Sequence, residues 1–133
     1  MAVLLVAGMI VSGACASSSP TGPTATTGQA SSLCQALKEA SGSDVTLTSK
    51  AAWDQRLALT AALVALAPLA QQANAQVYLQ LVADRVQLAS HYNYVSVQQL
   101  PEGVRNKFIA DHQNQQAQSN IFIDYATTTC NMG

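Results

Sequence analysis

Hydrophobic and polar positions beyond residue 32 recur at the spacing of amphipathic helices, and small polar residues, glycine or proline separate the helical segments. The pattern predicts four helices, which cover residues 31–40, 49–66, 68–91 and 100–128. The first begins at Ser31 or Ser32, the second begins after Thr48 or Ser49, and Pro68 is expected as the first residue of the third. The predicted fold is therefore all-α, a small up-and-down helical bundle.

The N-terminal segment has a different pattern. Residues 2–11 form a continuous apolar run, which is too short to cross a bilayer and is typical of a secretory signal peptide. Ser12-Gly13-Ala14-Cys15 follows and resembles the lipobox of bacterial lipoproteins, in which small residues precede a cysteine. The resemblance implies that residues 1–14 are a removable signal peptide. It also implies that Cys15 carries fatty-acyl chains such as palmitate, which anchor the protein to the cell membrane.

An ordinary signal-peptide cleavage is the alternative. Ala14-Cys15-Ala16 also fits the small-x-small pattern of that cleavage site, which would remove Cys15 and release a soluble secreted protein. Residues 15–32 contain neither a charged nor a large apolar side chain, so they cannot bury enough surface to offset their ordering entropy. We therefore expect a disordered tether over 15–32 and the helical-bundle domain over 33–133.

The cysteine count is consistent with export. The chain has three cysteines, and an unpaired thiol is unusual in an oxidising compartment. If Cys15 is acylated or removed, Cys34 and Cys130 are left to form a disulfide. That bond would close a loop of about a hundred residues and stabilise the domain by about 4–5 kcal/mol in the chain-entropy model.

Charge and hydropathy argue against a nucleic-acid surface and against a membrane-spanning helix. Only 10% of the residues are charged, the net charge is −1 and the basic residues are scattered, so no nucleic-acid surface is expected. Residues 57–70 are strongly apolar but fall short of the roughly twenty residues of a membrane span, and they include Pro68. We expect a central bundle helix that is contacted on most sides. The surplus of apolar surface is also compatible with a dimer face or a lipid-lined cavity.

His91, Tyr92 and Tyr94 are a candidate haem or metal site, because imidazole and phenolate both bind haem iron. A surface cluster at a helix end is the favoured alternative. If the last two long helices are antiparallel about residue 96, His112 lies level with residue 80. The two histidines are then roughly 15 Å apart, too far to share one metal.

The last helix has three polar residues, His112, Gln115 and Ser119, on a stripe that is otherwise apolar. They should lie opposite Gln76 and Gln80 of the preceding helix. Because buried polar side chains need partners, these residues could form a hydrogen-bonded layer or line a ligand pocket. Alternatively, residues 111–120 overhang the bundle or form a solvated loop.

The sequence lacks the glycine-rich phosphate loop, His-Glu-x-x-His, Gly-x-Ser-x-Gly and Cys-x-x-Cys motifs. We therefore do not expect an enzyme, and no cofactor is specified. The sequence predicts an exported, lipid-anchored cell-envelope protein whose helical domain is a binding or scaffold module. An envelope protein or a second copy of the chain is the candidate partner. The alternative is a secreted carrier of a small ligand, haem or lipid.

Overall fold

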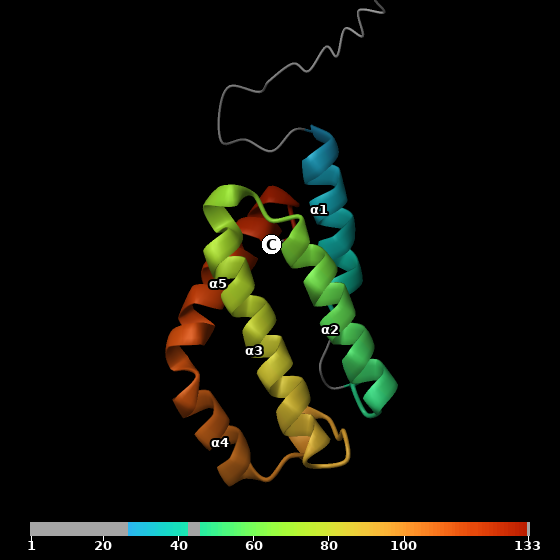
Figure 1. Cartoon of the computed structure of the whole chain (residues 1–133), viewed down its shortest axis with the longest axis vertical. Coiled ribbons are helices and arrows are strands. Elements are labelled where there is room, and N and C mark those ends of the chain that lie inside the picture. The colour runs from blue at the N-terminus through green and yellow to red at the C-terminus, as the bar shows by residue number, and fades with distance from the viewer. Residues whose placement is uncertain (1–26, 43–45, 133) are drawn as a thin grey trace, which may run out of the picture.

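Residues 27–42 and 46–132, the part of the chain that this computed structural model describes, contain five α-helices and two complete 3-10 helices. The α-helices are α1 (Thr27–Ala40), α2 (Lys50–Ala65), α3 (Gln72–Ser90), α4 (Glu102–Asp111) and α5 (Gln113–Thr129). The 3-10 helices are η2 (Leu69–Gln71) and η3 (Val97–Gln99). No strand occurs in the two described ranges, so the all-α prediction is confirmed. Figure 1 shows α4 at the opposite end of the bundle from α1.

Helix α1 begins at Thr27, earlier than the predicted start at Ser31 or Ser32. Residues 27–32, which the sequence analysis assigned to the tether, therefore belong to a helix. Leu33 is buried and the neighbouring residue is disulfide-bonded, so the helix is held there and extends toward its N-terminus at little cost. The signal peptide over residues 1–14, the lipid site at Cys15 and residues 15–26 of the tether lie outside the described residues.

The joint between α2 and α3 differs from the prediction in its detail. Ser49 caps α2 as expected, because its side chain accepts a hydrogen bond from the backbone N–H of Ala52. Pro68, however, has an extended conformation and precedes η2, so it is not the first residue of the third helix. Gln72 opens α3, and its Nε2 donates to the carbonyl of Ala67 at 2.6 Å. The amide side chain thus satisfies a backbone carbonyl in the connection between α2 and η2.

The main core lies where α3 packs against α2 and α5 and where α1 packs against α2 and α5. Apolar side chains from four helices meet there: Leu33 and Leu37, Leu63 and Val64, Ala75, Phe122 and Ala126. A smaller cluster around Trp53, Leu47 and Ala89 lies next to the turn after α3. The small alanines let the helices approach closely.

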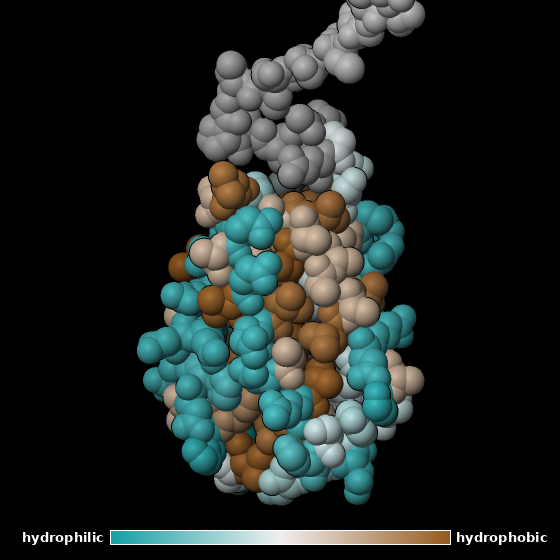
Figure 2. All heavy atoms as spheres, viewed as in Figure 1, coloured by the Kyte–Doolittle hydropathy of each residue, from teal (hydrophilic) through white to brown (hydrophobic). Residues whose placement is uncertain are grey.

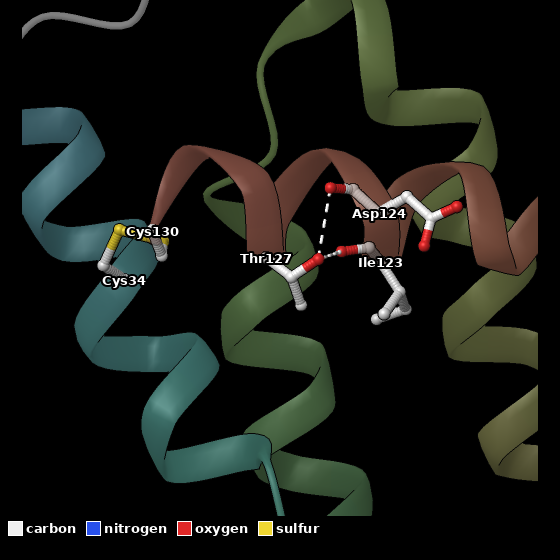
Figure 3. The surroundings of a disulfide bond; sticks show 5 residues. All are labelled: Cys34, Ile123, Asp124, Thr127 and Cys130. Carbon is white, nitrogen blue, oxygen red and sulfur yellow. Dashed lines mark hydrogen bonds between the residues drawn. A yellow bond between two sulfur atoms is a disulfide. The ribbon is translucent and has the colours of Figure 1, made fainter. Parts of the chain in front are cut away.

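The predicted disulfide between Cys34 and Cys130 is present. It joins the middle of α1 to the residue that follows α5, with the two Cα atoms 5.3 Å apart and a sequence separation of 96 (Figure 3). One turn before Cys130, the hydroxyl of Thr127 donates to the carbonyl of Ile123 at 2.9 Å, within α5. The disulfide therefore connects the first and last helices of the described bundle.

Helix α2 is contacted on two sides rather than on most sides. It packs against α1 and α3 and buries Thr60, Leu63 and Val64. Its opposite face is exposed and is lined by small apolar side chains, those of Ala58, Ala61, Ala62 and Ala65. Figure 2 shows brown and pale-brown apolar atoms running down the middle of the face in view. None of the described helices has the length and apolar character needed to cross a bilayer.

The single last helix predicted over 100–128 is two helices. His112 interrupts it with a φ of −114° and a ψ of 16°, and the resulting bend between α4 and α5 is visible in Figure 1. Residues 113–120 are helical, so the solvated-loop alternative for residues 111–120 is wrong, although most of these side chains are exposed. The break coincides with tertiary contacts of the His112 side chain, which a helical pattern in the sequence does not reveal.

Candidate ligand-binding site

A cavity of about 460 Å³ lies beneath α4, between that helix, η3 and α3. This volume falls within the usual range of small-ligand sites. Its walls are mostly apolar and come from three parts of the chain: Leu88 and Ala89 on α3, Val97 and Leu100 around η3, and Phe108 and Ile109 on α4. Trp53 of α2 adds an aromatic side chain that is almost fully buried. The arrangement provides an apolar pocket that opens beside an exposed helix.

The turn between α3 and α4 positions one side of this cavity. Asn93 and Tyr94 both have positive φ values, 57° and 56°, and the N–H of Tyr94 donates to the carbonyl of Ala89 at 2.8 Å. Asparagine tolerates this left-handed conformation well, whereas tyrosine does so at a cost. The Tyr94 side chain packs against the cluster around Trp53, and this contact holds it in place. The reversed chain then directs Leu100 inward, where it is 5% exposed.

Helix α4 covers the cavity without being part of the core. None of its residues is buried, and Ile109 is 63% exposed although it lines the cavity. Two contacts hold its ends: Arg105 Nη1 donates to the carbonyl of Gln98 at 3.0 Å, and His112 lies at its C-terminus. Few buried contacts mean low local stability, so α4 is the element best placed to move for ligand entry.

His112 connects α4, α5 and α3. Its Nδ1 is 2.7 Å from the carbonyl oxygen of Phe108 and must carry the proton there, because a carbonyl oxygen only accepts. Its ring stacks on that of Phe108 with centroids 3.9 Å apart. On the other side, Nε2 lies 3.4 Å from Oδ2 of Asp84, whose Oδ1 accepts a 2.8 Å hydrogen bond from Gln80 Nε2. The imidazole thereby fixes the bend that forms the roof of the cavity.

Two of the predicted polar residues are linked through a third residue, and the group is partly exposed rather than buried. His112 and Gln80 meet through Asp84, which the sequence analysis did not single out. Asp84 could have been found as the only acidic residue within one helical turn of Gln80. Gln76 is exposed, Gln115 is partly buried, and Ser119 is buried with no hydrogen-bond partner among the described residues. The structure does not join these three to the His112 group.

The register of the last two long helices was predicted one turn away from its observed position. His112 meets Asp84 rather than lying level with residue 80, and Gln116 accepts a 3.0 Å hydrogen bond from Arg85. The predicted turn centre near residue 96 did not allow for η3, which lengthens the connection before α4 begins. The predicted and observed positions differ by four residues, which is about one helical turn. The last helix therefore faces different residues of α3 from those that were predicted.

The structure does not place His91, Tyr92 and Tyr94 in the cavity. His91 is exposed at the C-terminal end of α3, whereas Tyr94 packs against the Trp53 cluster. Within residues 27–42 and 46–132, no group of three or more His, Cys, Asp or Glu side chains could hold a metal ion.

A second cavity, of about 690 Å³, lies between α1, α2, α3 and α5. It shares Trp53, Arg85 and Gln116 with the first cavity. The hydrogen-bonded pair of Arg85 and Gln116, together with Trp53, therefore forms the wall between the two. Its lining mixes polar and apolar side chains, so the cavity beneath α4 is the better site for an apolar ligand.

Comparison with known proteins gives no relative: no family model, no curated protein and no solved structure matches this chain.

Proposed function

We propose that this chain is an exported binding protein whose helical domain takes up a small, largely apolar ligand in the cavity beneath α4. The observation that carries the proposal is the cavity itself, about 460 Å³ in volume and enclosed mainly by apolar side chains. Water gains few hydrogen bonds in such a space, so an apolar ligand that replaces it binds favourably. The proposal combines the binding module and the small-ligand carrier that the sequence suggested.

Export is the second part of the proposal. The disulfide between Cys34 and Cys130 supports it, because such bonds persist mainly in oxidising compartments. We propose that lipidation at Cys15 anchors the domain to the outer face of the cell membrane, with secretion as the alternative. The mass of the mature protein, purified from its native membrane, distinguishes an acylated Cys15 from one removed by cleavage.

Trp53 provides a direct assay for binding, because it is the only tryptophan of the chain and lines the cavity. N-phenyl-1-naphthylamine is a neutral apolar dye whose absorption overlaps tryptophan emission. Titrating it into the disulfide-intact protein should quench Trp53 emission and raise dye emission, with saturation at one dye per chain. No energy transfer at dye concentrations up to its solubility would contradict the proposed function.

Two exposed isoleucines form a matched pair of variants. Ile109 lines the cavity, whereas Ile121 on α5 lines neither cavity, and the two are 63% and 52% exposed. We predict that Ile109→Ser weakens dye binding about fivefold, since it removes roughly 1 kcal/mol of apolar contact. Ile121→Ser should leave the dissociation constant unchanged. Equal effects of the two changes would place the dye outside the cavity.

A further inference from the structure

The charged side chains of the cavity have one sign. Among the described residues that line it, Arg85 and Arg105 are cationic, and none is an aspartate or a glutamate. A cation beside an apolar cavity is poorly solvated unless an anion or a set of hydrogen-bond acceptors faces it. The lining therefore complements a ligand that has an anionic group as well as an apolar body.

Arg105 is the residue best placed to hold that group. It is partly buried at the start of α4, and the carbonyl of Gln98 fixes one of its nitrogens at 3.0 Å. A guanidinium has five N–H donors, and no carboxylate in the described part of the chain lies within ion-pair distance of this one. The side chain is thus oriented by the backbone while it retains donors for a two-oxygen acceptor.

Arg85 has a different role from Arg105. Its Nη2 already donates to Gln116 Oε1 at 3.0 Å, and it makes further interactions, so its role does not depend on a vacant donor. Its charge nevertheless contributes to the positive potential of the cavity, and Gln113, close to His112 at the bend, adds an amide donor to the lining. The polar groups lie beside an otherwise apolar enclosure, which is the arrangement expected for an amphiphile.

From these contacts we infer that the natural ligand is a single-chain amphiphile with an anionic oxygen headgroup, such as an aliphatic carboxylate, and that Arg105 binds the headgroup. The inference rests on the proposed function and specifies the ligand class. The chain would lie against Leu88, Val97 and Phe108, and the headgroup would remain at the junction of η3 and α4. Two oxygens of the headgroup would accept hydrogen bonds from the guanidinium of Arg105.

Displacement of N-phenyl-1-naphthylamine tests the inference with three ligands of one chain length: dodecanoate, dodecanol and dodecyltrimethylammonium, each below its critical micelle concentration. Dodecanoate should displace the dye at about a tenth of the dodecanol concentration, because charge-assisted hydrogen bonds to the carboxylate are strong. The ammonium compound should be the weakest. Equal potency of dodecanoate and dodecanol overturns the inference and leaves the proposed function standing, whereas failure of the dye to bind overturns both.

Two variants on α4 test whether Arg105 is the residue that binds the headgroup. In Arg105→Gln, the dodecanol concentration needed to displace the dye, divided by the dodecanoate concentration needed, should fall from about ten to about one. Because both ligands are measured on the same variant, this ratio is independent of dye affinity. Lys107→Gln is the matched control: Lys107 is exposed, is ion-paired with Asp111 on the same helix and does not line the cavity. It should keep the ratio of the unmodified protein. A ratio that survives Arg105→Gln, or that Lys107→Gln abolishes equally, contradicts the assignment of the headgroup site.

Discussion

Thr60 and Ser119 have hydroxyl groups that are both buried but differ in their hydrogen bonding. Thr60 Oγ1 donates to the carbonyl of Arg56 at 2.8 Å, whereas Ser119 Oγ has no partner among the described residues. The sequence correctly predicted that Ser119 faces inward, because it lies on the apolar stripe of the last helix. Its expected polar neighbours were wrong, because they depended on a register that the length of the turn determines.

This difference gives a prediction at the scale of single residues. Ser119→Ala should raise the free energy of unfolding by up to about 1 kcal/mol, since it removes an unsatisfied buried hydroxyl and introduces a better helix former. Thr60→Val should lower it by about 1 kcal/mol, because a satisfied hydrogen bond is lost. Urea unfolding followed by circular dichroism measures both. Destabilisation of Ser119→Ala similar to that of Thr60→Val would show that Ser119 has a partner.

At the scale of elements, the sequence predicted the helices better than the joints between them. The C-terminal end of α1 and both ends of α2 were found because Ser41-Gly42, Ser49 and Pro68 are local signals. The break at His112 has no such signal, because it accompanies contacts with Phe108 within the helix and with Asp84 on another helix. Tertiary contacts of this kind override the continuous helical pattern over 100–128.

Helix α4 should be the least protected of the long helices. It has no buried residue, whereas α3 and α5 bury Leu81, Val82 and Phe122 among others. We predict that backbone amides of α4 exchange with deuterium at least tenfold faster than those in the middle of α3 and α5, because local opening of α4 exposes little apolar surface. Hydrogen exchange followed by mass spectrometry measures this. Protection of α4 equal to that of α3 would show that it does not open separately.

For the whole molecule, the sequence predicted the all-helical bundle and the disulfide between Cys34 and Cys130, and both are confirmed. It did not predict the cavity. The lining residues extend from Trp53 to Gln116 and come from several helices and the turn at η3, so they meet only when the register of α3, α4 and α5 is known. His112 was the one member found in advance, because a histidine on an apolar stripe is conspicuous.

The claim that the cavity beneath α4 is a binding site is tested most directly by ¹H–¹⁵N nuclear magnetic resonance. The chain has one tryptophan, so its spectrum contains a single indole N–H resonance, that of Trp53 in the cavity wall. On titration with N-phenyl-1-naphthylamine, we expect this resonance and the amides of Val97 and Ile109 to shift along one saturation curve. Unchanged positions of all three, with shifts confined to the exposed alanines of α2, would contradict it.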